Sequence, residues 1–336
     1  MRAMGRVLLA ANVPPEENGG VANVVRAHAA GLRALHPDCR VEHVPGGASW
    51  AAYQVRCLRW WLRRPGRPAA VIGHGADGVA LLALGRLLGV PRLITVWHGF
   101  AVTCDRVLRK AGCGPQIPRR QYWTAWLSLR LARSTFVLSR ADRLWLRVAW
   151  GLPAAVLPQG RPDGPTPRPR PVGRAAAALF LGHPSARKGF DRFVACSADV
   201  DLRFVHIGAR VWSAGLGRVE SLGPMAQARV AAYLAAEAVV VVAPSRYEGS
   251  PLAVVEALCA GRPVLTTGWG GQRDLLRGTG MYLREPGGLR ARLGEVAANY
   301  DAYCARAAEV AAGLPTWVEV ARLLWGPEAR RRGAGA

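Results

Sequence analysis

The stretch that decides the fold runs from Ala243 to Gly271 and reads APSRYEGSPLAVVEALCAGRPVLTTGWGG. It ends a short β-branched run, AVVVVA at 238–243, of the kind found in strands that are buried on both faces. Ser250-Pro251 predicts the start of a helix, with serine as N-cap and proline at the first helical position, and Gly261 predicts its left-handed end. The run PVLTT at 263–267 predicts a second, parallel strand. We therefore expect a βαβ unit whose loop lies at the carboxyl end of a strand, where open α/β sheets bind ligands.

Two glutamates mark this loop and the helix that follows it. Glu248 precedes the helix start, and Glu256 lies inside the helix, with seven residues between them. The free amides of a first helical turn suit an anion such as a pyrophosphate. A carboxylate suits a sugar diol instead, because it accepts two hydrogen bonds. Alternatively, Glu248 is a capping carboxylate and Glu256 a solvated helix acid, and these two residues alone leave that choice open.

The stretch resembles the E-x7-E signature of retaining GT-B glycosyltransferases of family 4, whose run is P-S-x-x-E-G-x-x-x-x-x-x-E-A-x-x-x-G-x-P-V. The matching residues are Pro244, Ser245, Glu248, Gly249, Glu256, Ala257, Gly261, Pro263 and Val264. The resemblance implies an α/β fold with two Rossmann-like domains facing across a cleft. It also implies transfer of a hexose from a nucleoside-diphosphate sugar to an acceptor hydroxyl, with Glu248 at the donor sugar and Glu256 at the nucleotide ribose. The implied donor contacts nearby are Gly249, Ser250, Pro251 and Leu252.

A basic element, Arg187-Lys188-Gly189, opens another expected helix. It resembles the K-G element of the same family, whose basic side chains bind the donor pyrophosphate, and the R-K-G form is similar to that of lipopolysaccharide core glucosyltransferases. The resemblance implies a catalytic Lys188 and a donor-binding Arg187, a UDP-hexose donor, no metal and no separate cofactor. It also favours a glycan or lipid-linked acceptor in lipopolysaccharide or other cell-envelope biosynthesis. Taken alone, these residues are equally typical of a solvated helix start.

The first half of the chain repeats the alternation of strands and helices. Gly19-Gly20 follows the first expected strand and resembles the diglycine loop with which the family touches the donor phosphates. His74-Gly75 and His98-Gly99 each follow a later strand. The context T-V-W-H-G of His98 resembles the family's T-x-H-G, which implies that this side chain acts as a catalytic group against the transferred sugar. His74 is as readily a core or capping histidine.

Five prolines within 162–171, the last four at alternate positions from Pro165 to Pro171, predict an extended, semi-rigid spacer. We therefore expect an N-terminal domain at 1–164, a linker at 165–173 and a C-terminal domain at 174–314. The family resemblance implies that the first domain is on the acceptor side and that the second binds the nucleotide sugar. The helix expected at 315–326 resembles the family's terminal helix, which implies that it packs back on the N-terminal domain, and we expect a disordered basic tail at 327–336.

The formal net charge of +23 comes from 45 basic residues, of which only Lys110 and Lys188 are lysine. Such a surface attracts polyanions, anionic lipid or phosphorylated sugars. A nucleic-acid-binding protein is one rival, but no binding motif or aromatic stacking signature accompanies the charge, so we expect no nucleic acid. An inactive GT-B scaffold and a GT-B epimerase or phosphorylase are the other rivals. Scattered cysteines without a C-x-x-C pair, no signal peptide and no 18-residue apolar run indicate a cytoplasmic protein.

The segment RCLRWWLRRPGR at 56–67 predicts an interfacial helix on anionic lipid. On a helical wheel its arginines fall within about 140° of arc, opposite an apolar side that includes Cys57, Leu58, Trp61 and Leu62. The expected membrane-binding residues are Arg56, Arg59, Trp60, Trp61, Arg63 and Arg64. The alternative is an ordinary surface helix whose tryptophans are buried in the domain.

Overall fold

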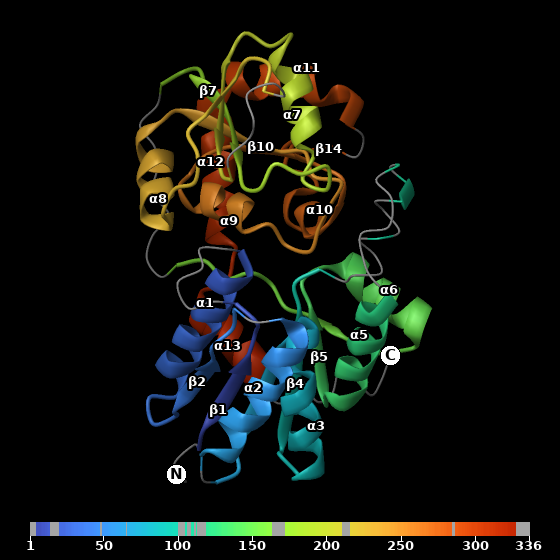
Figure 1. The fold of residues 1–336 in the computed structure, drawn as a ribbon. Helices are drawn as coiled ribbons and strands as arrows, with labels where there is room; N and C mark the ends of the chain where they lie inside the picture. Colours follow the sequence, from blue (N-terminus) through green and yellow to red (C-terminus); the bar gives the residue numbers. More distant parts are fainter. Residues whose placement is uncertain are drawn as a thin grey trace. The chain divides into compact units, whose positions relative to one another are not determined.

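The structure is a computed structural model. It describes residues 5–13, 20–47, 49–64, 66–99, 105, 109–110, 112, 119–162, 172–209, 216–283 and 286–326. The chain forms two compact units: Met1–Asp105, Gln116–Gly160 and Pro315–Ala336 make the first, and Arg106–Pro115 and Arg161–Leu314 make the second. Each unit carries its own six-stranded sheet (Figure 1). Gly19, most of the expected linker and the expected tail lie outside the described residues.

The elements of the first unit alternate along the chain and end with a helix from the C-terminal part of the sequence. They are β1 (Val7–Ala10), α1 (Gly20–Leu35), β2 (Val41–Val44), α2 (Trp50–Leu62), β3 (Ala70–His74), η1 (Gly75–Gly78), α3 (Val79–Leu87), β4 (Arg92–Trp97), α5 (Arg119–Leu131), β5 (Ser134–Val137), α6 (Arg140–Trp150), β6 (Ala155–Val156) and α13 (Trp317–Trp325).

The strands of the first unit are parallel and follow the order β2-β1-β3-β4-β5-β6. Alternate residues of each strand face opposite sides, so that Leu9 packs with α1 and α13 while Leu8 packs with α2 and α3. The chain leaves β1 toward β2 and then crosses to β3 on the other side. The topological switch point of this sheet, where ligands bind in such folds, therefore lies between β1 and β3.

Helix α13 packs lengthwise against α1, and the two lie together in Figure 1. The contact depends on Gly31, because a Cβ atom there would come within 2.5 Å of the backbone oxygen of Trp317. A capping box starts α13: the Thr316 side chain accepts from the Glu319 N–H, and the Glu319 carboxylate accepts from the Thr316 N–H at 2.7 Å. Buried residues Val320 and Leu324 then join the core of the first unit.

The second unit alternates strands and helices in the same way. Its elements are β7 (Ala177–Leu181), α7 (Phe190–Ser197), β8 (Arg203–Ile207), β9 (Val219–Ser221), α8 (Gln227–Ala236), β10 (Val239–Ala243), β11 (Tyr247–Glu248), α9 (Leu252–Cys259), β12 (Val264–Thr267), β13 (Trp269–Gly270), α10 (Gly271–Leu276), β14 (Tyr282–Leu283), η3 (Pro286–Gly288), α11 (Leu289–Ala298) and α12 (Tyr300–Ala312).

The main sheet of the second unit has the order β14-β12-β10-β7-β8-β9, again with parallel pairs throughout. Its centre is β10, whose four valines are fully buried, as the continuous β-branched run predicts. Each buried valine side chain contributes about 1.5–3 kcal/mol relative to exposure. The chain moves from β7 toward β8 and β9 and then returns to β10 on the opposite side. The switch point of this sheet therefore lies between β7 and β10.

Candidate functional site

The loops that follow β7 and β10 meet at the switch point of the second unit. The Arg246 N–H donates to the Arg187 carbonyl at 2.8 Å, and the Ser245 hydroxyl donates to the Lys188 carbonyl at 3.4 Å. Gly189 makes the close approach possible: its φ is +72°, and a Cβ atom would lie 2.0 Å from the Pro244 oxygen. Hydrogen bonds to the carbonyls of the basic element therefore hold it against the signature loop.

Glu248 lies between two cations at this junction. Its Oε1 is 2.9 Å from Arg187 Nη1 and 3.1 Å from Lys188 Nζ, and the residue is only 8% exposed. We expected Glu248 in an irregular loop, but it belongs to the short strand β11, which pairs with β13. Gly270 permits the pairing, because a Cβ atom there would lie 1.8 Å from the backbone carbonyl oxygen of Glu248. The strand fixes the direction of the carboxylate, and the two cations exceed its charge by one.

A second ion pair holds the same loop from behind. The Arg246 guanidinium forms two 2.8 Å bonds to the Asp191 carboxylate on α7 and also donates to the Ala186 carbonyl. These hydrogen bonds hold the pKa of Asp191 below its ordinary value. Such a fork-shaped contact is geometrically specific, so it restricts how the loop can move.

Helix α9 begins at Leu252, one residue later than Ser250-Pro251 predicted. Pro251 occupies the N-cap position with φ −77° and ψ 113°, and no side chain caps the helix there. The prediction that Ser250 is the N-cap is therefore wrong, because the chain is still extended at Pro251. Gly261 does adopt the expected left-handed conformation at the other end, with φ +67°. Helix α9 starts four residues after Glu248, which contacts Arg187 and Lys188, and a helix start without a side-chain cap suits an anion.

The second glutamate of the signature is held by a residue that the sequence analysis missed. Gln227, the first residue of α8, donates from Nε2 to Oε1 of Glu256 at 3.1 Å. Burial raises the pKa of the Glu256 carboxyl. Nothing in the local sequence of Gln227 indicates this contact, because α8 reaches α9 only through the tertiary fold.

Arg262 is a second missed residue, and it is 5% exposed. Its guanidinium donates to the carbonyls of Leu234 and Ala235 at the end of α8 and, at 3.1 Å, to the Tyr300 hydroxyl. A buried arginine that satisfies orphan helix carbonyls connects α8, β12 and α12. Arg262 therefore supports the helix that carries Gln227.

In the first unit, three histidines lie together near the carboxyl ends of the strands. His98 follows β4 and is half-buried; its Nε2 lies 2.7 Å from Nδ1 of His74 at the end of β3. The His28 ring on α1 has its centroid 5.4 Å from that of His74. Burial lowers the pKa of His28 to about 3 and of His98 to about 4, and it lowers the pKa of His74 strongly. All three rings are therefore neutral at pH 7.

The loop after β1 contacts the turn after β3. The Asn12 N–H donates to the Asp77 carboxylate at 2.8 Å, and the Asn12 side-chain oxygen accepts from the Gly47 N–H at 3.1 Å. Burial raises the pKa of the Asp77 carboxyl. Gly20 is the first residue of α1, whereas its expected partner Gly19 lies outside the described residues.

The expected membrane helix is α2, and part of its apolar side faces inward. Trp61 is 6% exposed and packs with Cys57 in the core of the first unit. The prediction that Trp61 enters lipid is therefore wrong, because this side of the helix covers the sheet. Trp60 donates its indole N–H to Glu42 at 3.2 Å, and Arg64 pairs with the same carboxylate at 3.1 Å while lying over the Trp60 ring.

Other residues of α2 and the turn after it do face outward. They are Val55, Arg56, Leu58, Arg59, Leu62 and Arg63. Arg56 also donates to the carbonyls of Pro45 and Gly46. Across the described segments, no helix has both the length and the apolar character to cross a membrane.

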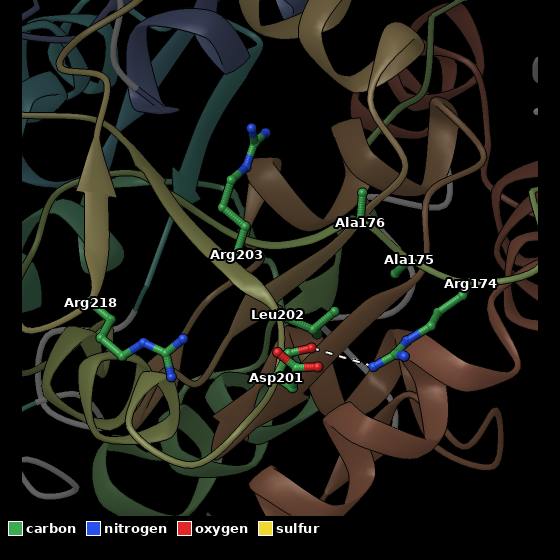
Figure 2. Close-up of a pocket in the computed structure, with 7 residues that line it drawn as sticks. All are labelled: Arg174, Ala175, Ala176, Asp201, Leu202, Arg203 and Arg218. Carbon is green, nitrogen blue, oxygen red and sulfur yellow. Dashed lines mark hydrogen bonds between the residues drawn. The ribbon is translucent and has the colours of Figure 1, made fainter.

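A hollow of 460 Å³ lies at the opposite end of the strands of the second sheet (Figure 2). Arg174 and Arg218 extend toward Asp201 from two sides, and Arg203 extends away from it and pairs with Glu237 at 3.6 Å. These residues stand at the amino ends of β7 and β8 or beside them. Because open α/β sheets bind ligands at the carboxyl ends of their strands, the hollow is not part of the candidate site.

Comparison with solved structures defines the fold class. Sucrose-phosphate synthase from Thermosynechococcus elongatus aligns with a TM-score of 0.73 and 17% identity over 96% of this chain and 97% of its own. Anabaena HepE, solved in complex with UDP-glucose, aligns with a TM-score of 0.68 and 15% identity over 96% of this chain and 98% of its own. WaaG, a glycosyltransferase involved in lipopolysaccharide biosynthesis, aligns with a TM-score of 0.68 and 15% identity over 96% of this chain and 100% of its own. The chain has the GT-B fold of these proteins, as the sequence predicted.

Comparison at the level of sequence is narrower. The family model described as "Glycosyl transferases group 1" matches residues 176–299, within the second unit. The comparison with curated proteins gives no match. The matched segment contains Arg187, Lys188, Glu248 and Glu256, so the family model and the charged site lie in the same part of the chain.

Proposed function

We propose that the chain is a glycosyltransferase that moves a hexose from a nucleoside-diphosphate sugar to an acceptor hydroxyl. One observation carries the proposal: Arg187, Lys188 and Glu248 form a compact charged group at the switch point of the unit that matches the glycosyltransferase model. Cations beside an uncapped helix start bind a diphosphate. A buried carboxylate next to them accepts hydrogen bonds from sugar hydroxyls.

The reaction releases a nucleoside diphosphate, so its transition state accumulates negative charge on the diphosphate. Lys188 and Arg187 stabilise that charge without proton transfer, and the amides at Leu252 add the positive end of the α9 dipole. Glu248 orients the donor sugar and Glu256 holds the ribose. In this scheme His98 contributes a neutral hydrogen-bonding group to the transferred sugar.

The proposed donor is UDP-hexose, and the proposed outcome is retention of the anomeric configuration without a metal. Three considerations support this choice: the E-x7-E spacing of Glu248 and Glu256, the R-K-G element, and the UDP-glucose that HepE binds. The proposed acceptor is a cell-envelope glycan or lipid-linked sugar, in line with the involvement of WaaG in lipopolysaccharide biosynthesis.

A panel of nucleotide sugars tests the proposal directly. We expect UDP-glucose or another UDP-hexose to raise the melting temperature and to be hydrolysed slowly without an acceptor. The matched control is Lys188→Ala, which should lose both effects. Binding without any hydrolysis or transfer would indicate an inactive scaffold, and equal stabilisation by DNA fragments, erased by salt, would indicate a nucleic-acid-binding protein.

The proposed location is the cytoplasmic side of an anionic membrane, with α2 as the contact. Its outward residues combine Leu58 and Leu62 with Arg59 and Arg63. Arginines near such a surface contribute about 1 kcal/mol each. Arg59→Glu with Arg63→Glu should abolish sedimentation with anionic vesicles while leaving donor hydrolysis intact.

Arg64 is left unchanged in that test because it pairs with Glu42. The control variant carries the same charge change in the second unit, Arg218→Glu with Arg277→Glu, and should sediment like the wild type. Unchanged sedimentation of the α2 variant would refute this location.

A further inference from the structure

The contact between His74 and His98 is a hydrogen bond between two neutral rings. Nδ1 of His74 and Nε2 of His98 are 2.7 Å apart, and the ring planes differ by only 12°. The ring centroids are 5.0 Å apart, farther than the two nitrogens, so the rings meet nitrogen to nitrogen at their edges, which is the geometry of a directed hydrogen bond. Because each neutral imidazole carries a single proton, one ring donates and the other accepts.

Burial around His74 decides the direction of this bond. His74 is 2% exposed, and its Nε2 is buried without a hydrogen-bond partner among the described residues. If His98 donated, the proton of His74 would sit on that nitrogen and form a buried, unpaired N–H. If His74 donates from Nδ1, its Nε2 carries only a lone pair. Unpaired buried donors are the rarer and costlier case, so His74 donates.

We infer that His74 is a positioning residue that fixes the tautomer of His98. Its Nδ1–H donates to Nε2 of His98, so the single proton of His98 lies on Nδ1. His98 thereby becomes a fixed hydrogen-bond donor through the nitrogen that His74 does not occupy. On the proposed function, on which this role rests, that donor serves an oxygen of the transferred sugar.

Two neighbouring features keep the arrangement in place. His74 ends β3 in register with Val96 of β4, two residues before His98, so the sheet sets the separation of the two rings. His28 also contacts His74, with ring centroids 5.4 Å apart, and packs edge-on against Trp317, with centroids 5.6 Å apart. Burial keeps the pKa of each histidine below neutrality, so the rings keep one proton apiece at pH 7.

A pair of matched variants tests the direction of the bond. In His74→Asn the amide nitrogen takes the place of Nδ1 and still donates, whereas in His74→Asp the carboxylate only accepts. The readout is the protonation of each ring nitrogen of His98, measured by long-range ¹⁵N NMR on histidine-labelled, ligand-free protein at pH 7. His98→Gln identifies the His98 signals among the seven histidines.

We expect a proton on Nδ1 of His98 in the wild type and in His74→Asn, and on Nε2 in His74→Asp. With UDP-glucose as donor, His74→Asp should lower kcat about tenfold or more with little change in KM, and His74→Asn should retain most activity. A wild-type proton on Nε2, a charged ring, or identical spectra for the two variants would overturn the inference. The wild-type spectrum decides the direction even if a variant fails to fold. The expected spectra without any turnover of nucleotide sugars would refute the proposed function and leave the tautomer assignment standing.

Discussion

Each unit is built on a six-stranded parallel sheet with one switch point, although the strand orders differ, and the groups at the two switch points differ in charge. The first unit gathers His28, His74 and His98, which burial keeps neutral. The second unit gathers Arg187 and Lys188 around the buried Glu248, and the site has an excess positive charge. The topology thus determines where a site forms, and the side chains on the loops determine what it binds. A neutral site suits sugar hydroxyls, and a positive one suits a diphosphate.

The largest effect expected from breaking this contrast comes from Lys188→Ala. Removing one preorganised cation should lower kcat with UDP-glucose by about 10²- to 10³-fold. Lys110→Ala is the matched control, since Lys110 is exposed and is the other lysine of the chain. Steady-state kinetics on both proteins give the comparison, and near-normal turnover of Lys188→Ala would remove this residue from the mechanism.

The neutral site should make the protein sensitive to acid. The folded pKa of His28 is about 3, below the unfolded value of about 6.5, so the unfolded state binds more protons between these values. The stability from this group is complete above pH 6.5 and is lost as the pH falls, by about 2 kcal/mol at pH 5. The melting temperature of His28→Phe should therefore fall less between pH 7.5 and pH 5 than that of the wild type. Parallel losses in both proteins would contradict the neutral assignment.

Much of the architecture could be predicted because it is encoded locally. The valine run of β10, the left-handed Gly261 and the spacing of Glu248 and Glu256 all lie within one stretch, so chain geometry alone brings them to one loop and one helix. The predicted start of α9 was one residue too early, because Pro251 is compatible with both extended and helical backbone. Local signals thus identify elements well and their ends less well.

Contacts between distant elements left no such signal. Gln227 and Glu256 are 29 residues apart, and they meet only because α8 packs near α9. Trp61 is apolar on either reading of its helix, and only the observed packing against the sheet shows that it faces inward. The pairing of His74 with His98 likewise follows from strand register. Sequence pattern indicates which residues are special, but it does not indicate which residues they contact.

A smaller effect is expected for Glu256→Gln, which should weaken UDP binding but raise the stability of the fold. Glu256→Gln should weaken UDP binding about tenfold, because an amide is a poorer acceptor for the ribose diol than a carboxylate. Burial raises the folded pKa of Glu256, so the folded state binds more protons and stability falls as the pH rises through that pKa. The variant should therefore melt at a higher temperature than the wild type at pH 7, and the gap should close near pH 4. Titration calorimetry gives the UDP affinity, and scanning calorimetry gives the melting temperature. A variant that is less stable than the wild type at pH 7 would contradict the burial argument.

The central claim is that Arg187 and Lys188 bind the diphosphate while Glu248, which pairs with both cations in the free protein, binds the donor sugar. The most direct test is UDP binding to Glu248→Gln. Titration calorimetry should show UDP bound as tightly as by the wild type or up to about tenfold more tightly, because the competing carboxylate is gone. Uridine should bind equally to both proteins, and turnover of UDP-glucose should fall in the variant. Loss of UDP affinity in Glu248→Gln, with turnover unchanged, would contradict the account.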